Sequence, residues 1–491
     1  MTIQIQQSEA LVPLPDVLHT ELFIAGQWRG GAEQRRIEVR DPSTGETITD
    51  IAGAETADCV DAVEAAAAAG ASWAAKAPRA RAEILQRAWE IMRAERAELA
   101  ALISAENGKA TADALGEIDY AGEFFRWYAE EAVRITGDFR LSPSGDKRIV
   151  VSHEPVGVCV LITPWNFPAA MATRKIGPAL AAGCTVVLKP ATETPLTAAA
   201  IVDVLDRAGV PAGVVNLVTP HRTSESVSAM LHHPAVRKLS FTGSTEVGRL
   251  LLRKTADTVV SSSMELGGNA PLVVLEGADI SLAVQGAMVA KLRNGGAACT
   301  AANRLYVHRS VAEEFCRRLA EEMTNLATGP GRVASNTVGA LVSTVERDKV
   351  AALVDGAVEE GAQVVTGGTT PDGPGAFYPP TVLADVRPDS SITRQEIFGP
   401  VAPVVVFDTE DEAVEWSNAT EMGLSAYVFG ELAAAMRVAH RLQSGMVAIN
   451  RGVLSDPAAP FGGVKQSGLG REGSFEGMEE YLEKKYIAVD M

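Results

Sequence analysis

Three side chains in this sequence could carry out covalent catalysis together. Cys299 follows Asn294-Gly-Gly-Ala-Ala, Glu265 opens Glu265-Leu-Gly-Gly-Asn269, and Asn166 lies within Pro164-Trp-Asn-Phe-Pro168. A thiolate sulfur attacks a carbonyl carbon to give a tetrahedral intermediate, and an amide donor stabilises the oxyanion that develops. A carboxylate in an apolar setting has a raised pKa and can activate a water. The set is suited to oxidising an aldehyde through a covalent thioester.

Cys299 differs from the other cysteines in its surroundings. It follows a Gly-Gly pair and precedes Thr300-Ala-Ala-Asn303, which predicts a helix start or turn where backbone N–H groups favour a thiolate. An odd number of scattered cysteines with no CxxC pair indicates neither a disulfide framework nor a zinc site, so reduced thiols are expected. The other four are expected to be small buried hydrophobes: Cys59, Cys159, Cys184 and Cys316.

A second group of residues is suited to binding a dinucleotide, although the sequence does not use the GxGxxG fingerprint. Phe241-Thr-Gly-Ser244 is predicted to end a strand and to open a helix over Thr245–Leu252. Gly243 would allow close approach of a pyrophosphate, and the N–H and hydroxyl of Ser244 would face it at the positive end of the helix.

Together these segments resemble the aldehyde dehydrogenase superfamily from about Leu22 to the C-terminus. The blocks occur in family order, and Glu265 and Cys299 are 34 residues apart. The resemblance implies that Cys299 is the nucleophile, that Asn166 and the Cys299 N–H are oxyanion donors, and that Glu265 is the base for thioester hydrolysis. The blocks are Thr163–Pro168, Phe241–Gly248, Glu265–Asn269, Asn294–Cys299 and Glu396–Pro400.

The resemblance also implies NADP as the cofactor, with NAD possible. Family members restricted to NAD often have Glu three residues after the lysine that reaches the adenosine ribose, and that carboxylate repels a 2′-phosphate. Here the lysine is Lys189 and the residue is Thr192, with Glu193 one step further. Glu396 and Phe398 would hold the nicotinamide ribose and ring. The remaining cofactor residues implied are Thr163, Trp165, Gly243, Ser244 and Leu266.

Within the superfamily the sequence is most similar to bacterial succinate-semialdehyde dehydrogenases. That resemblance assigns the distal carboxylate of the substrate to Arg174, Arg293 and Ser455, since two guanidiniums can grip a carboxylate bidentately. The alternatives are that Arg174 pairs with a structural acid and that Arg293 is a helix C-terminal charge. A glutarate semialdehyde or a sulfonated aldehyde also stays open, because Arg451–Ala459, at the expected substrate entrance, matches less closely.

Two departures from the family concern the nucleophile loop. Gln or Glu is usual two residues before the nucleophile, and Ala297 stands there, which predicts a looser loop. Some relatives have a second cysteine two residues after the nucleophile, and Ala301 excludes that disulfide switch.

The sequence disfavours two functions of other classes. A catalytically inactive structural or binding protein on this scaffold is disfavoured because Cys299, Glu265 and Asn166 are all present. A metal hydrolase is disfavoured because the histidines include a single adjacent pair, His232-His233, which is typical of a surface loop. No metal is expected.

The composition limits the partners. The chain has 491 residues, 47% of them hydrophobic, and a net charge of −18, which disfavours nucleic acid or an anionic membrane as a partner. An anionic substrate would need locally placed cations. No apolar run suggests a membrane span and the N-terminus lacks a basic secretion signal, so the protein is expected in the cytoplasm. The resemblance implies a homodimer or a homotetramer.

Alternating apolar strands and helices predict two α/β lobes in series. The resemblance implies that both lobes are Rossmann-like and that a small β oligomerisation arm is added to them. One amphipathic helix is expected over Pro78–Gly108. Strands are expected at Gly157–Thr163, Cys184–Lys189, Val214–Val218, Val236–Phe241, Pro271–Leu275, Arg304–His308 and Val401–Phe407. The expected domains are 1–131 with 152–262 for the cofactor, 263–455 for catalysis, and 132–151 with 470–491 for the arm.

Overall fold

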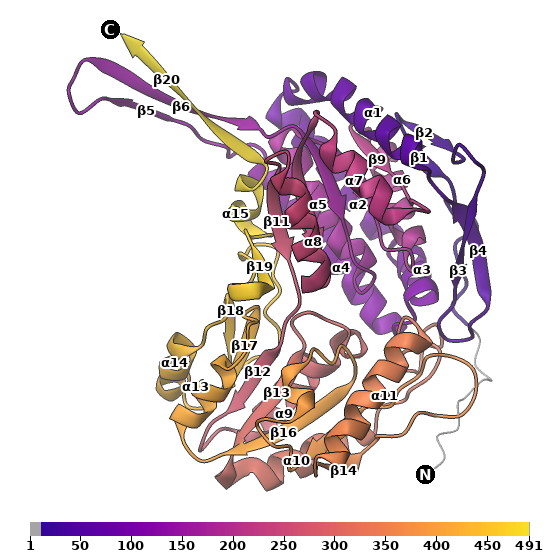
Figure 1. Ribbon diagram of the computed structural model, residues 1–491, viewed down its shortest axis with the longest axis vertical. Helices are drawn as coiled ribbons and strands as arrows, with labels where there is room; N and C mark the ends of the chain where they lie inside the picture. Colours follow the sequence, from indigo (N-terminus) through magenta and orange to yellow (C-terminus); the bar gives the residue numbers. More distant parts are fainter. Residues whose placement is uncertain (1–10, 491) are drawn as a thin grey trace.

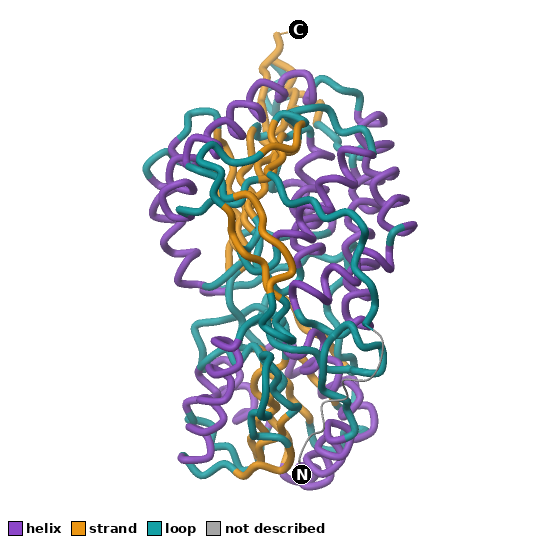
Figure 2. The backbone as a smooth tube through the Cα atoms, turned by 90° about the vertical axis from the view of Figure 1, so that its right-hand side faces the viewer, coloured by secondary structure: helices purple, strands orange, loops and turns teal. Residues whose placement is uncertain are grey.

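A computed structural model describes residues 11–490, so the ends of the expected 1–131 and 470–491 segments lie outside the described residues. The chain forms two α/β lobes, one above the other, and a narrow β arm that leaves the first lobe (Figure 1). In each lobe the strands lie in the middle with helices on both sides (Figure 2). The predicted fold class is therefore confirmed.

The first lobe is built on an eight-stranded sheet of order β19-β11-β10-β7-β8-β9-β1-β2, in which β7 to β11 are parallel. Its strands are β1 (Leu22–Ile24), β2 (Gln27–Arg29), β7 (Val158–Ile162), β8 (Thr185–Lys189), β9 (Val215–Leu217), β10 (Val236–Thr242), β11 (Ser261–Glu265) and β19 (Gly468–Leu469). Its helices are α1 (Thr56–Ala74), α2 (Pro78–Ala94), α3 (Arg96–Asn107), α4 (Thr111–Glu131), α5 (Pro168–Ala182), α6 (Pro195–Arg207), α7 (Thr223–His232), α8 (Thr245–Ala256) and α15 (Ser474–Glu479).

The central strands are apolar along their whole length because both faces of the sheet are covered. Cys159 and Leu161 of β7 pack into one core, with residues of α2, α4, α5 and α6. Val158, Val160 and Ile162 of the same strand pack into another core, with residues of α1, α7 and α8. Near-continuous apolar strands are typical of parallel sheets buried on both faces.

The prediction of one helix over Pro78–Gly108 is wrong in one respect, because this segment forms two helices. α2 ends at Ala94 and α3 begins at Arg96, with Glu95 as the non-helical residue between them (φ −99°, ψ 18°). Gly108, with φ +89°, ends α3 in the left-handed conformation. The apolar spacing continues across Glu95, and for that reason periodicity alone does not detect the break.

The second lobe is built on a seven-stranded sheet of order β14-β15-β16-β13-β12-β17-β18, parallel except for β14. Its strands are β12 (Ala270–Val274), β13 (Ala302–His308), β14 (Gln363–Thr366), β15 (Thr381–Ala384), β16 (Val401–Phe407), β17 (Ser425–Phe429) and β18 (Met446–Ile449). Its helices are α9 (Ile280–Leu292), α10 (Arg309–Thr324), α11 (Thr344–Glu359), α12 (Ser391–Arg394), α13 (Glu410–Asn418) and α14 (Leu432–Arg441).

The arm is an antiparallel sheet of order β20-β6-β5, formed by β5 (Asp138–Leu141), β6 (Lys147–Pro155) and β20 (Leu482–Asp490). Its bounds differ from the expected ones, because β6 runs on to Pro155. The segment Ser474–Glu479 is not part of the arm, since it is helix α15, which packs against α4 and α5. A separate hairpin consists of β3 (Arg36–Arg40) and β4 (Thr47–Ala52).

The carboxyl ends of the parallel strands place the sequence motifs together. Ile162 of β7 pairs with Phe241 of β10, and Thr242 pairs with Glu265 of β11. Thr163, Gly243 and Leu266, which follow these strands, therefore leave the sheet at one edge. Ligands of open α/β sheets bind at this edge.

Among residues 11–490, no helix combines the length and the apolar composition that a membrane span requires.

Candidate active site

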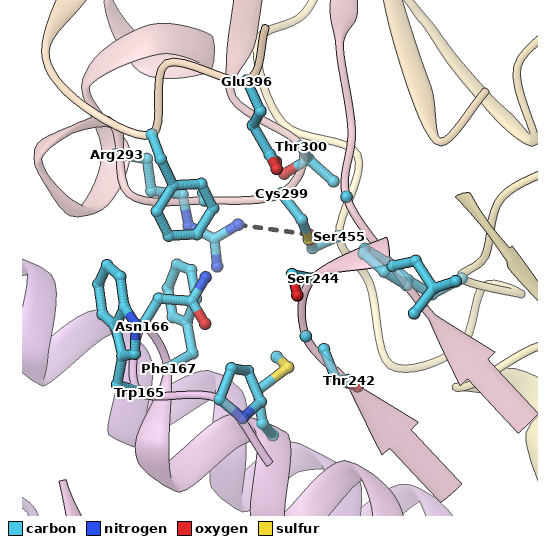
Figure 3. A pocket seen from close by; sticks show the side chains of 18 of the residues that line it. Trp165, Asn166, Phe167, Thr242, Ser244, Arg293, Cys299, Thr300, Glu396 and Ser455 are labelled. Atoms are coloured by element: carbon cyan, nitrogen blue, oxygen red, sulfur yellow. Dashed lines mark hydrogen bonds between the residues drawn. The ribbon is translucent and has the colours of Figure 1, made fainter. Parts of the chain in front are cut away.

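A cavity between the two lobes is lined by residues from most of the predicted blocks (Figure 3). The first lobe contributes segments after β7 and β10, and the second lobe contributes the loop that carries Cys299. Eleven of the predicted site residues line it: Trp165, Asn166, Arg174, Gly243, Ser244, Leu266, Arg293, Cys299, Glu396, Phe398 and Ser455. Glu265, Thr163, Lys189 and Thr192 are not among the lining residues.

Cys299 lies in a turn between a 3-10 segment, Arg293–Gly296, and strand β13, so the predicted turn is present and a helix start is not. Burial raises the pKa of its thiol to about 12, although Arg174 opposes the shift. The sequence predicted a helix start or a turn whose backbone N–H groups favour a thiolate. The turn is present, desolvation of the buried sulfur favours the neutral thiol, and the stabilised thiolate stays a prediction.

Asn166 is held next to the nucleophile loop. Its Nδ2 donates to the carbonyl oxygen of Ala297 at 3.1 Å, two residues before Cys299. An amide nitrogen carries two hydrogens, and this bond uses one of them. In Figure 3, Asn166 and Cys299 reach the same space from different lobes. The arrangement leaves a donor hydrogen for an oxyanion formed at Cys299.

Glu265 ends β11 and is buried, and neither carboxylate oxygen has a hydrogen-bond partner among the described residues. Burial and the nearby charge of Glu472 raise its pKa well above the usual range, while Arg174 and Lys175 oppose the shift. The raised pKa agrees with the apolar setting expected from the sequence. The carboxylate lies against Gly462, where a Cβ would come within 2.9 Å of its Oε1.

The cofactor half of the cavity shows features that fit a dinucleotide. Ser244 caps α8, its Oγ accepting from the Val247 N–H at 3.4 Å, so its own N–H stands at the positive end of a twelve-residue helix. At Gly243 a Cβ would come within 2.5 Å of the Phe241 ring, which explains the glycine. These features suit a pyrophosphate, as the sequence predicts, with the Ser244 hydroxyl engaged as a cap.

Glu396, Phe398 and Trp165 form the neighbouring wall. Glu396 accepts from the Gly268 N–H at 3.1 Å, and burial raises its pKa to about 7. The Trp165 and Phe398 rings meet edge to face, with centroids 5.2 Å apart. Phe398 has a φ of +55°, which is uncommon for a bulky residue and marks a fixed geometry.

Lys189, the last residue of β8, and Thr192, which follows this strand, are not part of the cavity wall. The Thr163 N–H donates to the Lys189 carbonyl at 3.1 Å. Lys189 is largely buried, and its Nζ donates to the carbonyl of Pro190. Thr192 and Glu193 are both exposed. No carboxylate stands at the position of Thr192 itself.

The two predicted substrate arginines differ in their partners. Arg174 is fully buried, its Nε lies 2.5 Å from Oε2 of Glu472, and its guanidinium stacks 4.2 Å from the Phe461 ring centroid. Arg293 has no carboxylate partner at ion-pair distance among the described residues, and its Nη1 donates to the Ser455 hydroxyl at 3.3 Å (Figure 3). Both arginines line the cavity; Arg174 is ion-paired with Glu472, whereas Arg293 is hydrogen-bonded to Ser455, and the assignment of both to the substrate carboxylate stays a prediction.

Several residues around the site were not predicted. Glu472 also contacts Lys175 Nζ, at 2.5 Å, and both side chains are buried. Tyr120 and Phe167 stack on Arg293, at 5.5 and 5.0 Å from ring centroid to Cζ. The ion pair between Lys175 and Glu472 spans 297 residues, and no local spacing reveals it. The described part of the chain holds no group of His, Cys, Asp and Glu arranged to bind a metal ion.

Comparisons with known proteins agree with this geometry. The model of the aldehyde dehydrogenase family matches residues 28–487. A succinate-semialdehyde dehydrogenase from Paenarthrobacter nicotinovorans is 52% identical over 84% of this chain and 92% of its own. A 3-sulfolactaldehyde dehydrogenase from Pseudomonas putida is 45% identical over 97% and 98%. The solved structure of an NADP-dependent enzyme from Escherichia coli superposes with a TM-score of 0.95 at 42% identity, over 99% of this chain and 100% of that one.

Proposed function

This chain belongs to the aldehyde dehydrogenase family, and on that basis we propose that it oxidises succinate semialdehyde to succinate, with NADP as the preferred cofactor and NAD as a second one. The observation that carries the substrate class is Arg293, a half-buried guanidinium in the cavity wall without a carboxylate partner among residues 11–490. Other anionic aldehydes are the second candidate substrates, because relatives are named 3-sulfolactaldehyde dehydrogenase and glutarate-semialdehyde dehydrogenase.

The chemistry follows from the residues around Cys299. The Cys299 thiol loses its proton to solvent, the thiolate sulfur attacks the aldehyde carbon, and the free Nδ2 hydrogen of Asn166 and the Cys299 N–H donate to the resulting oxyanion. When bound, the nicotinamide of the cofactor accepts the hydride that leaves this carbon. Glu396 and Phe398 would hold the nicotinamide half, and Gly243 with the α8 N-terminus would hold the pyrophosphate.

Glu265 activates the water that hydrolyses the thioester. Its oxygens have no hydrogen-bond partner among the described residues, so no bond has to break when the side chain rotates toward Cys299. Its raised pKa makes it a stronger base once it has ionised.

Arg293 should distinguish acid from uncharged substrates. Truncating an arginine that makes a charge-assisted contact costs ~1.5–3 kcal/mol, or roughly 10- to 150-fold in kcat/KM. We expect Arg293→Met to lower kcat/KM for succinate semialdehyde by this factor and to leave butanal, of equal chain length, nearly unchanged. Steady-state kinetics with both aldehydes measures the difference.

Arg79→Met is the matched control, because it removes an equal charge from an exposed residue of α2 outside the cavity. It should leave both substrates unchanged. Arg174→Met should lower both substrates alike, since it leaves Glu472 buried without its guanidinium partner. Equal losses for both substrates in Arg293→Met would show that Arg293 is structural as well.

Thr192 supports the cofactor preference. An exposed threonine leaves room for a 2′-phosphate, and Thr192→Glu should repel it. We expect the native enzyme to use NADP at least as efficiently as NAD, and the variant to shift the ratio of the two kcat/KM values toward NAD. Glu193→Gln is the control variant, because it changes the neighbouring residue and lies before α6. Strict NAD dependence of the native enzyme would show that Glu193 already fills this space.

The arm supports the proposal of a cytoplasmic homo-oligomer. Its two edge strands carry apolar side chains that stay largely exposed, among them Phe139 of β5, which is 69% exposed, and Tyr486 of β20, which is 55% exposed. Exposed apolar groups on the edge strands of a sheet are typical of surfaces covered by another copy. All five cysteines are free thiols, as in a reducing compartment.

A further inference from the structure

The loop that carries Cys299 is tied to Asn166 by a second asparagine. Asn294 is buried, and its Nδ2 donates to the Asn166 carbonyl and to the Ala297 carbonyl, both at 2.8 Å. Asn166 Nδ2 donates to the same Ala297 carbonyl. The backbone of the proposed oxyanion donor and the backbone of the nucleophile loop are thus joined through one carboxamide.

The conformation of Asn294 makes this joint possible. Its φ is +59°, and Gly295 and Gly296 continue in the left-handed region with φ values of +59° and +80°. Asparagine tolerates this region better than other residues with a side chain. At Gly296 a Cβ would come within 2.2 Å of the Gly399 carbonyl, so this turn has no room to shift.

A buried ion pair holds the other side of the Asn166 carbonyl. Lys109 Nζ donates to this carbonyl and to Oε2 of Glu117, both at 2.6 Å. Oε1 of Glu117 accepts from the N–H groups of Ala169 and Ala170, in the first turn of α5. Both charged side chains are at most 2% exposed. The pair therefore connects α4, the start of α5 and the turn that carries Asn166.

We propose that Asn294 and Lys109 are positioning residues, which hold Asn166 and the Cys299 loop in the geometry needed for the oxyanion. They take over a task expected of the side chain two residues before the nucleophile, where this chain has Ala297. The loop is held through the Ala297 backbone carbonyl instead, which opposes the loosening predicted from the alanine. This proposal rests on the proposed function, because it assumes that Asn166 is an oxyanion donor.

Asn294→Gly isolates the side chain, since glycine adopts the left-handed conformation without strain. We expect kcat to fall by about 10- to 100-fold, since a displacement near 1 Å at a reacting centre costs up to about 10²-fold. The dissociation constant of NADP and the KM should change by less than about threefold. Asn294→Asp should be no better, because a carboxylate cannot donate to two carbonyls.

The lysine is tested together with its partner, because removing one member would leave a buried charge unpaired. We expect Lys109→Met/Glu117→Gln to fold and to lower the rate of the first burst of reduced cofactor by about 10-fold or more. Lys238→Met/Glu480→Gln is the matched control: Lys238 is equally buried and paired with Glu480, but the pair lies outside the cavity wall. It should keep the native burst rate.

A double-mutant comparison decides whether Lys109 acts through Asn166. If it does, adding Lys109→Met/Glu117→Gln to Asn166→Ala should slow the burst by less than about twofold beyond Asn166→Ala alone. Independent, multiplying losses would overturn the proposal, as would native kcat in Asn294→Gly. Full activity of Asn166→Ala would instead contradict the proposed oxyanion donor itself, whatever the other variants do.

Discussion

Replacing Cys299 with alanine is expected to abolish aldehyde oxidation while the protein still binds NADP. Without the sulfur no thiohemiacetal forms, and the carbon that must release a hydride is never held at the cofactor. Loss of a covalent nucleophile costs at least about 10⁴-fold in kcat. The measurement is the formation of reduced cofactor with succinate semialdehyde, beside NADP binding followed by protein fluorescence.

Cys316→Ala is the control for this experiment. Cys316 is also partly buried and its pKa is raised by burial to about 11, but it lies on α10, away from the cavity. Its variant should turn over at the native rate. Steady turnover by Cys299→Ala would remove the thioester mechanism, since no other cysteine lines the cavity within residues 11–490.

Replacing Glu265 with glutamine is expected to give one rapid burst of reduced cofactor and then almost no turnover. Thiohemiacetal formation and hydride transfer do not need this carboxylate, whereas hydrolysis of the thioester does. General-base catalysis contributes about 10²–10⁴-fold, so steady-state kcat should fall by that factor while the burst remains. Stopped-flow absorbance of the reduced cofactor measures both phases.

The pH dependence gives this prediction a second readout. Burial raises the pKa of Glu265, so the base form is gained as the pH rises, and native kcat should rise with it. The rise should be absent in Glu265→Gln. Glu106→Gln is the control, because Glu106 is buried and its pKa is raised to about 8, but it bonds the backbone at the start of α6. A missing burst in Glu265→Gln would place this residue before hydride transfer.

The sequence predicted those parts of the fold that local patterns determine. The strands β7, β8, β10 and β16 lie within one or two residues of their expected bounds, because each is an apolar run between turn residues. The sequence did not predict the division of Pro78–Gly108 into two helices, because Glu95 is neither glycine nor proline. Local propensity therefore gives no sign of the break.

The site was predicted where its residues lie within continuous motifs. Cys299, Asn166, Ser244 and Glu396 follow strand ends or occupy short loops, so their segments identify them. What the sequence did not reveal depends on distant partners. Arg174 was expected to face the substrate, but its charge is paired with Glu472, almost 300 positions later in the chain.

Electrostatics in the nucleophile loop could not be predicted for a similar reason. The Gly-Gly pair before Cys299 and Thr300–Asn303 after it suggested a helix start or a turn whose N–H groups would lower the pKa of the thiol. The fold places a turn and a strand after it, and burial between the lobes raises the pKa instead. The roles of Lys109 and Glu117 were not predicted either, because Lys109 lies between α3 and α4, Glu117 lies in α4, and both are far from every motif in the sequence.

The mass of the protein after rapid acid quenching tests the central claim most directly. Glu265→Gln is mixed with succinate semialdehyde and NADP, quenched after the burst, and digested for peptide mapping. We predict a succinyl group on Cys299, in an amount equal to the reduced cofactor formed in the burst. Reduced cofactor formed in that amount with Cys299 unmodified would contradict the thioester mechanism.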